Sequence, residues 1–343
     1  MKKTIIIDSK DLHKKVYQDL IRQAISKGET VVFPTETVYG IGADALNPLA
    51  VNEIYKAKGR PSDNPLIVHI ARKKDVSLYA KNISLYARKL MKVFWPGPLT
   101  LIFDKKDIVP YTTTGGLDTV AIRYPSHHIA KSMIKIAHKP LAAPSANISG
   151  RPSSTKFKHV YEDLNGRVDF IIDGGNSPIG IESTVIDVTS KIPVILRPGY
   201  ITKEMMESVL DMHIHDASDH KVDEKVKSPG MKYTHYKPEG DVKLLDGSPE
   251  KIKLFFDELH LANQTYAFIC SDELASIIEQ SECYPIGSIN QLDLIAKNLF
   301  SILRDMDDLK IKHIYVEFFP QDHIGHAIMN RLLKASGYQV IKL

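Results

Sequence analysis

The sequence predicts an α/β protein with two units, a larger one built on a mixed β-sheet and a smaller one built on a parallel sheet. Short apolar strand patterns alternate with helical patterns in both halves of the chain. A polar stretch with little apolar periodicity separates the halves, and 343 residues suffice for about two ordinary domains. We therefore predict a first domain over residues 1–205, a linker over 206–242 and a second domain over 243–343.

The first domain shows helical and strand patterns in irregular order. A helical stripe over residues 12–25 precedes a short buried strand, TVVF. Asn47 and Pro48 are a typical N-cap and first-turn pair for a helix that ends at Gly59, and Ser126 is expected to cap a later helix. Helices join some strands and hairpin-length links join others, which favours a mixed sheet. The further strands are expected in PLIVHIA, LTLIFDK, DTVAIRYP, PLAAP, VDFIID, STVIDVT and KIPVILR.

The second domain alternates more regularly. Its strands are expected in DVKLLD, TYAFICS, HIYVEFF and YQVIKL, and its helices over residues 249–260, 292–303 and 325–336. Regular alternation of strand and helix is typical of a parallel sheet with helices on both faces. We therefore expect a small, three-layer, Rossmann-like unit.

The composition is that of an ordinary globular protein, with 43% hydrophobic and 25% charged residues. The net charge of +4 is too small to indicate nucleic-acid binding by itself. Two cysteines without CxxC spacing favour neither a disulfide framework nor a zinc site. No apolar run reaches the roughly 20 residues that a membrane span requires. These features are typical of a cytoplasmic protein without a membrane contact.

Polar segments follow or precede the predicted strands of the first domain, where loops of an α/β sheet hold ligands. Four cationic side chains, those of Lys58, Arg60, Arg123 and Arg197, fall in such segments. Guanidinium groups bind phosphate or carboxylate through two parallel hydrogen bonds, so the set fits a polyanion. Neither GxxxxGK[ST] nor GxGxxG is present, and the standard phosphate loops therefore do not explain these cations.

The segment PSANISG, residues 144–150, offers short hydroxyl and amide side chains and accessible backbone N–H groups. Taken alone, Ser145 and Asn147 are ordinary turn or helix-cap residues, and KGRP is an ordinary exposed turn. Together with the cations, the segment fits a phosphate-binding loop without the Walker spacing.

Seven motifs in series resemble the YrdC-type threonylcarbamoyl-AMP synthases. They are PTETVYGIG, KGRPSDNPLIVHI, PGPLT, VAIRYP, PSANISG, GIESTVID and LRPG. The later segment SPGMKYTHYKP, residues 228–238, resembles the signature of the longer subfamily, which carries an additional C-terminal domain. The resemblance covers nearly the whole chain, and it implies a twisted open sheet around a deep, positive cavity in the first domain.

The resemblance implies a three-substrate reaction. L-threonine, bicarbonate or carbon dioxide, and ATP give threonylcarbamoyl-AMP and pyrophosphate, and a separate transferase machinery passes the threonylcarbamoyl group to tRNA. Direct contact with tRNA is left open. Magnesium is expected with ATP, but the sequence does not identify its ligands. No organic cofactor and no protein nucleophile are implied.

The resemblance also implies a role for individual residues. Arg123 is expected to neutralise the threonine carboxylate. The residues expected around threonine are Thr35, His69, Thr119, Arg123 and Ser183. The residues expected around ATP are Lys58, Arg60, Ser62, Asn64, Ser145, Asn147, Ser153, Arg197 and Tyr236. The segment SPGMKYTHYKP is expected to act as a lid, with Tyr236 reaching the nucleotide and the second domain anchoring the far end of the lid.

Two other interpretations remain open. A noncatalytic RNA-binding protein could use the same basic cavity, although no basic run interleaved with aromatic residues is present. A nucleotidyltransferase centred on the second domain would use the tetrapeptide HIGH, residues 323–326, but no KMSKS-like partner follows. We expect His323 and His326 to be surface or cap residues.

Overall fold

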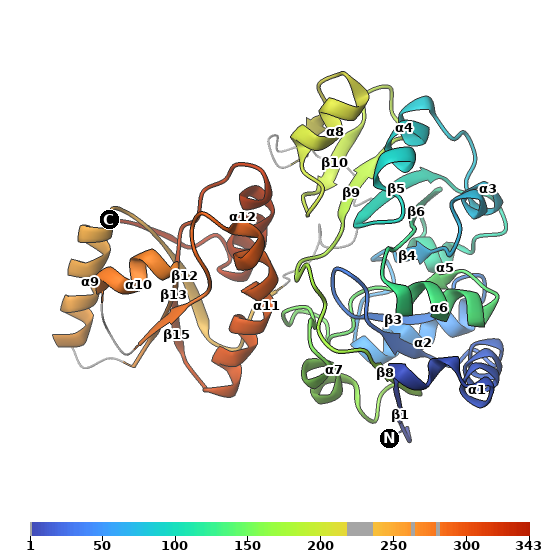
Figure 1. Ribbon diagram of the computed structural model, residues 1–343, viewed down its shortest axis with the longest axis horizontal. Coiled ribbons are helices and arrows are strands. Elements are labelled where there is room, and N and C mark those ends of the chain that lie inside the picture. The colour runs from blue at the N-terminus through green and yellow to red at the C-terminus, as the bar shows by residue number, and fades with distance from the viewer. Residues whose placement is uncertain (1, 218–235, 262–264, 279–281) are drawn as a thin grey trace. The chain divides into compact units, whose positions relative to one another are not determined.

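The computed structural model describes residues 2–217, 236–261, 265–278 and 282–343, and the chain forms two compact units (Figure 1). The first unit comprises Met1–Ser149, Ser153–Pro178 and Glu182–Lys232. The second comprises Gly150–Pro152, Ile179–Ile181 and Tyr233–Leu343, so it includes two short segments that interrupt the first unit in the chain.

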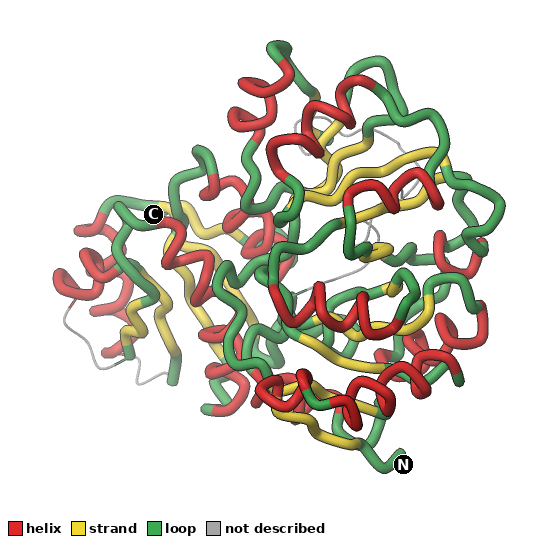
Figure 2. The backbone as a smooth tube through the Cα atoms, turned by 45° about the vertical axis from the view of Figure 1, so that its right-hand side comes forward, coloured by secondary structure: helices red, strands yellow, loops and turns green. Residues whose placement is uncertain are grey.

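The first unit contains one large sheet whose strands alternate with mostly short helices (Figure 2). Its described strands are β1 (Ile5–Asp8), β2 (Val31–Phe33), β3 (Gly40–Asp44), β4 (Ile67–His69), β5 (Leu99–Asp104), β6 (Thr119–Arg123), β7 (Leu141–Ala142), β8 (Phe170–Asp173), β9 (Thr184–Asp187), β10 (Val194–Arg197) and β11 (His215–Asp216). Its described helices are η1 (Ser9–His13), α1 (Lys15–Ser26), α2 (Pro48–Lys58), η2 (Lys73–Asp75), α3 (Val76–Tyr79), α4 (Leu85–Phe94), α5 (Tyr111–Thr114), α6 (His128–Ala137), α7 (Phe157–Leu164) and α8 (Lys203–Leu210).

The strand order is β1-β8-β2-β3-β7-β4-β6-β5-β9-β10-β11. Parallel pairs such as β4–β6 and β5–β9 alternate with antiparallel pairs such as β5–β6 and β9–β10. The prediction of a mixed sheet is therefore confirmed. The strand β3 was not predicted, because its sequence GIGAD has two glycines and no alternation of large apolar residues.

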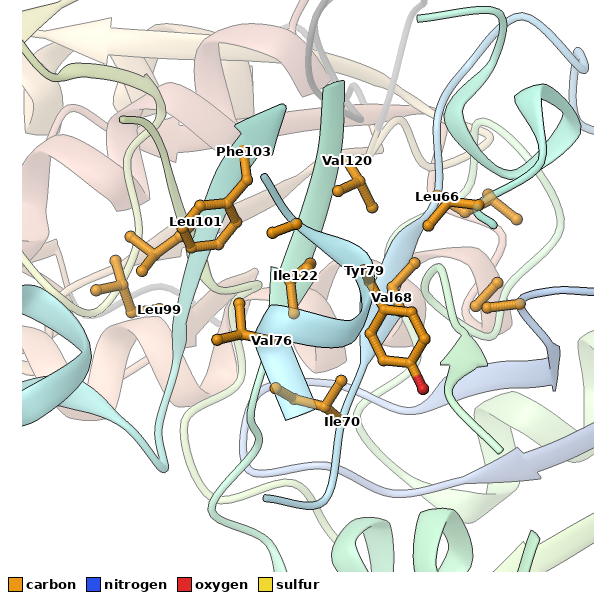
Figure 3. Packing of buried hydrophobic residues seen from close by; sticks show 14 of the residues in the cluster. Leu66, Val68, Ile70, Val76, Tyr79, Leu99, Leu101, Phe103, Val120 and Ile122 are labelled. Atoms are coloured by element: carbon orange, nitrogen blue, oxygen red, sulfur yellow. The ribbon is translucent and has the colours of Figure 1, made fainter. Parts of the chain in front are cut away.

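The two faces of the central strands pack against different apolar clusters. Leu99, Leu101 and Ile122 pack into the main apolar core, where Figure 3 shows them beside Val68 and Phe103. Successive side chains of a strand point to opposite faces, so the intervening residues face the other way. On that other face a smaller apolar cluster is formed by Ile67, Ile102, Ala121, Val185 and Leu196. His69, Thr100 and Arg123 continue the same alternation and thus share the face of this smaller cluster.

Local signals explain several helix boundaries. The Asn47 side chain accepts hydrogen bonds from the backbone N–H groups of Leu49 and Ala50, and Gly59 ends α2 in the left-handed conformation. The predicted cap at Ser126 is wrong. His127 occupies the N-cap of α6 without a capping bond from its side chain, and the backbone N–H of Ser126 is bound by Glu36 instead.

The second unit has a five-stranded sheet of order β14-β13-β15-β12-β16, in which every described pair is parallel. Figure 1 shows α9 and α10 on one face of this sheet and α11 and α12 on the other, which confirms the three-layer prediction. Its elements are β12 (Asp241–Asp246), α9 (Pro249–Leu261), β13 (Ala267–Cys270), α10 (Asp272–Ile278), β14 (Cys283–Pro285), α11 (Leu292–Asp308), β15 (His313–Glu317), α12 (Ile324–Ala335) and β16 (Val340–Lys342).

The predicted linker begins inside regular structure, because α8 spans residues 203–210 and β11 pairs with β10. Its central part, residues 218–235, lies outside the described residues. Across the described ranges, none of the helices combines the length and apolar character that crossing a membrane demands.

Candidate functional site

Four predicted site residues lie in one row across neighbouring strands. In the parallel pair β4–β6, His69 is in register with Arg123, and in the antiparallel pair β5–β6, Thr100 is in register with Arg123. The hydroxyl groups of Thr100 and Ser183 lie 2.8 Å apart, which extends the row to the start of β9. Arg197, at the end of β10, completes it by donating to the carbonyl oxygen of Ser183 from Nε (3.0 Å) and Nη2 (2.8 Å).

Arg123 is the central cation of this row, and it is 4% exposed. Its Nη1 donates to Oγ1 of Thr37 over 2.8 Å, and its Nη2 lies 2.7 Å from Oε1 of Glu36. Burial acts to raise the pKa of the Glu36 carboxyl, but the Arg123 charge and the hydrogen bonds that Glu36 accepts outweigh it and hold that pKa below its usual value. The buried pair is therefore ionised at neutral pH. We call Thr37, His69, Arg123 and Ser183 the Arg123 group.

His69 is a neutral neighbour of this cation. Burial, followed by the positive charge of Arg123, lowers the pKa of His69 to about 3. Its Nδ1 lies 3.1 Å from the carbonyl oxygen of Ile67. The neutral ring therefore donates from Nδ1 and leaves Nε2 as an acceptor.

A second set of side chains gathers around Lys58, the last residue of α2. Nζ of Lys58 donates to the backbone carbonyl oxygens of Ser145 and Asn147, each over 2.6 Å, and the side chain is 1% exposed. The backbone N–H of Ser149 donates to the carbonyl oxygen of Lys58. The structure thus brings KGRPSDN and PSANISG together, and we call Lys58, Ser145 and Asn147 the Lys58 group.

The loop PTETVYG, between β2 and β3, contacts both groups. Its Thr37 accepts from Arg123, while its Tyr39 exchanges backbone hydrogen bonds with Ala146 and Ser154. Thr35, in the same loop, uses its hydroxyl within the loop by donating to the carbonyl oxygen of Val38 over 2.6 Å. The loop therefore links the Arg123 group with the segment PSANISG, which carries two members of the Lys58 group.

Family comparisons agree with this geometry. Residues 23–199 match a family model described as "Telomere recombination", and residues 201–337 match one described as "Threonylcarbamoyl-AMP synthase, C-terminal domain". A threonylcarbamoyl-AMP synthase of Pyrococcus abyssi is 44% identical over 341 residues, which cover 99% of this chain and 100% of that protein. The chain belongs to the threonylcarbamoyl-AMP synthase family. This confirms the resemblance found in the motifs.

Two further relatives of this threonylcarbamoyl-AMP synthase family member support the assignment. The enzyme of Bacillus subtilis is 46% identical over 319 residues, covering 93% of this chain and 92% of that protein. A crystal structure of Pyrococcus abyssi Sua5 complexed with L-threonine is 43% identical, covers 99% of both chains and has a TM-score of 0.88.

Two residues that closely follow Lys58 in the sequence, Arg60 and Asn64, are also buried. In the described part of the chain, neither Oδ1 nor Nδ2 of Asn64 has a hydrogen-bond partner, although the residue is only 1% exposed. Buried amides are normally paired, so this one is suited to a ligand. Arg60 donates from Nη2 to the carbonyl oxygen of Pro65 over 3.3 Å, and Ser62 is exposed.

Thr119 lies apart from the Arg123 group, whereas Ser153 contacts Glu182, which precedes Ser183 in the chain. The hydroxyl of buried Ser153 donates to Oε1 of Glu182 over 2.5 Å. Thr119 and Arg123 occupy opposite ends of β6, about 13 Å apart for four residues of a strand. Since Thr119 lies at the end of the sheet where PSANISG begins, the structure does not bring it together with Arg123, and we leave it out of the threonine site.

Tyr236, which was predicted to reach the nucleotide, is buried against side chains of the second unit. It is 5% exposed within the second unit, where its ring stacks on Phe300 at 5.2 Å and lies 5.8 Å from the guanidinium carbon of Arg331. Contact between Tyr236 and a nucleotide stays a prediction. The preceding lid residues lie outside the described residues. His323 is exposed at the N-cap position of α12, as expected for a surface or cap residue.

Sequence reasoning missed four buried polar residues: Glu36, Thr37, Thr100 and Glu182. Each lies inside a motif that was recognised, namely PTETVYG, PGPLT or GIESTV. The available signal was a carboxylate or hydroxyl within a recognised motif. Its partner in space could not be read from the sequence, because Thr37 and Arg123, for example, are 86 positions apart.

A preformed metal cage is absent from the described ranges, where no three His, Cys, Asp or Glu side chains group together. Glu36 is paired with Arg123, and Glu182 accepts from Ser153. Magnesium is commonly held by one or two carboxylates, water and substrate phosphates. The residues present therefore fit a magnesium ion carried by ATP better than one held by the protein alone.

Proposed function

We propose that this chain is an L-threonylcarbamoyladenylate synthase. It joins L-threonine, bicarbonate or carbon dioxide, and ATP into threonylcarbamoyl-AMP, with release of pyrophosphate, for threonylcarbamoyladenosine modification of tRNA. The observation that carries the proposal is full-length similarity to threonylcarbamoyl-AMP synthases together with two buried cationic groups linked by one loop. Two anion sites suit a reaction that joins an amino acid to a nucleotide.

The Arg123 group is the proposed threonine site. Arg123 pairs with the substrate carboxylate through N–H groups that Glu36, Thr37 and Gly97 leave available. The hydroxyls of Ser183 and Thr100 lie in the same row and would bond the substrate hydroxyl. His69, neutral at physiological pH, adds no second positive charge that would repel the substrate ammonium.

The Lys58 group is the proposed phosphate site. Lys58 and Arg60 supply charge, Asn64 supplies its unpaired amide, and PSANISG supplies short side chains and backbone N–H groups. Ser62, Ser145, Asn147, Ser153 and Arg197 complete the proposed nucleotide contacts. Magnesium bound with ATP would neutralise part of the phosphate charge.

The chemistry needs positioning more than a protein nucleophile. The uncharged amine of threonine forms a C–N bond to carbon dioxide and loses a proton, which gives a carbamate. A carbamate oxygen then bonds to the α-phosphorus, while the bond from that phosphorus to the pyrophosphate oxygen breaks and pyrophosphate keeps the electron pair. Holding the two substrates in line is a large share of catalysis for such transfers.

The product would pass to a separate transferase that modifies tRNA, and we expect the enzyme in the cytoplasm. Exchange of labelled pyrophosphate into ATP tests the proposal. It should require both threonine and bicarbonate. Exchange that proceeds equally well without threonine would refute the proposal, and RNA binding without any exchange would favour the noncatalytic alternative.

A further inference from the structure

Glu36 is a buried carboxylate in the loop that links the two groups. It lies between Thr35 and Thr37, and its side chain is 6% exposed. Oε1 lies 2.7 Å from Nη2 of Arg123 and accepts from the backbone N–H of Ser126 over 3.1 Å. Oε2 lies 3.4 Å from the backbone nitrogen of His127, which donates to it. Glu36 therefore joins the loop, the end of β6 and the start of α6.

The guanidinium of Arg123 is held on three sides. Nε donates to the carbonyl oxygen of Gly97 over 3.4 Å, Nη1 donates to Thr37, and Nη2 faces Glu36. A guanidinium has five N–H groups. The bonds from Nε and Nη1 and the charge of Glu36 hold the group, and the N–H groups without a hydrogen-bond partner in the described part of the chain, those of Nη2 among them, are left for a ligand. Of the three partners, only Glu36 carries a charge, and only the carboxylate also anchors a neighbouring helix.

The positive charge of Arg123 and the negative charge of Glu36 balance each other. A guanidinium buried without a counter-charge would destabilise the fold, and Glu36 removes that penalty. A substrate carboxylate that binds Arg123 then lies close to a second negative charge. Affinity must consequently come from the direction of the remaining N–H groups more than from excess positive charge, which makes the orientation of Arg123 decisive.

We propose that Glu36 is a positioning residue for L-threonine, which holds the Arg123 guanidinium with its remaining N–H groups directed at the substrate carboxylate. This inference rests on the proposed function. It assigns to PTETVYG the task of orienting the carboxylate-binding arginine, in addition to any direct contact that Thr35 makes.

The experiment is a double-mutant cycle on the full chain, read by steady-state kinetics and by calorimetric titration with L-threonine. Glu36→Ala should raise the KM for threonine at least tenfold and leave the KM for ATP within twofold. Glu36→Gln keeps an oxygen for Arg123 and Ser126, so it should raise the KM for threonine by a smaller factor. Since the second variant preserves the shape of the site, it remains informative if Glu36→Ala does not fold.

The cycle separates positioning from a structural role. In an Arg123→Ala background, adding Glu36→Ala should not raise the KM for threonine further, because Glu36 has no arginine left to orient. Additive effects, or a threonine KM within twofold of wild type in both Glu36 variants, would overturn the inference. If the wild-type protein itself neither binds threonine nor makes the adenylate, the proposed function fails instead.

Asp169→Asn provides a matched control. Asp169 accepts hydrogen bonds from the backbone N–H and hydroxyl of Thr30 and pairs with Lys2, so it also ties strands together, but it lies outside both groups. This variant should lower the melting temperature without changing either KM. A comparable rise in the threonine KM in this variant would show that general loosening of the fold, and not orientation of Arg123, explains the Glu36 result.

Discussion

At the scale of residues, the site is defined by buried charges whose partners are specific. Arg123 is paired with Glu36 and Thr37, whereas Lys58 is held by two backbone carbonyl oxygens. The two cations are thus fixed in different surroundings, and each is expected to serve a different substrate.

Arg123→Ala should mainly impair the use of threonine, and Lys58→Ala should mainly impair the use of ATP. A hydrogen bond to a charged group contributes about 1.5–3 kcal/mol, so the affected KM should rise roughly ten- to hundredfold. Steady-state kinetics with each substrate varied in turn measures both. Arg123→Ala also leaves Glu36 buried without its partner, which should destabilise the fold. The melting temperature of each variant should therefore be measured together with its kinetics. Equal impairment for both substrates in both variants would contradict the division.

His69 makes the stability of the protein depend on pH. Its pKa is about 3 in the folded protein and 6.5 when unperturbed, so the unfolded chain binds a proton there first as the pH falls. The stabilisation by neutral His69 is complete above pH 6.5 and is lost toward pH 3. From pH 7 to pH 5 the expected loss is about 2 kcal/mol. In His69→Asn this part of the acid sensitivity should disappear from urea unfolding curves, and an unchanged loss in the variant would exclude His69 as its source.

At the scale of elements, the start of β9 is positioned by a close backbone approach at Gly199. A Cβ atom there would lie 2.5 Å from the backbone nitrogen of Thr184 and 2.8 Å from the carbonyl oxygen of Glu182. Both are backbone atoms that flank Ser183, so they cannot move aside as a flexible side chain could. LRPG is thus required for the position of GIESTV.

Gly199→Ala should therefore displace Ser183 and lower kcat/KM for threonine, by roughly tenfold or more, since errors of about 1 Å at a reacting site have large effects. Gly116→Ala is the control. Its backbone is in the left-handed region (φ +86°), but no atom lies within 4 Å of the added Cβ. It should lose about 1 kcal/mol of stability and keep its activity. Wild-type kinetics in Gly199→Ala would show that the approach is not needed.

The elements also show what the sequence could predict. Asn47 and Gly59 bound α2 as expected, because a cap and a left-handed glycine act locally. The predicted cap at Ser126 was wrong because α6 begins one residue later, with His127 at the N-cap position. The distant carboxylate of Glu36 accepts from the backbone N–H groups of Ser126 and His127 there, a contact that no local pattern indicates. The motifs located the Lys58 and Arg123 groups, yet the ion pair between Arg123 and Glu36 depends on a contact between segments far apart in the chain.

At the scale of the whole molecule, the boundary of the first unit lies beyond the predicted residue 205. Met206, Leu210 and Ile214 are buried in the main core of the first unit, and β11 pairs with β10. The second unit, in turn, includes Gly150–Pro152, where Arg304 donates to the carbonyl oxygen of Pro152 from Nε (3.0 Å) and Nη2 (2.7 Å). Residues 150–152 directly follow the phosphate-site residues of PSANISG in the chain.

A chain that ends at residue 217 should consequently fold but form little product, because residues 150–152 lose their contact with Arg304 and the segment SPGMKYTHYKP is missing. A chain that ends at Gly199 should be less stable, since it lacks the core residues of α8. Circular dichroism melts and product yield compare the two. Full activity of the 217-residue chain would show that product formation does not need the second unit.

The most direct test of the proposed reaction is mass spectrometry of the small molecules formed when the purified full-length protein is incubated with ATP, L-threonine and bicarbonate. Threonylcarbamoyl-AMP and pyrophosphate should form in equal amounts, their formation should depend on threonine, and Arg123→Ala and Lys58→Ala should both reduce it. Absence of the threonylcarbamoyl adenylate while the protein is folded, or its formation at an undiminished rate in both variants, would show that the protein does not catalyse this reaction through the two groups.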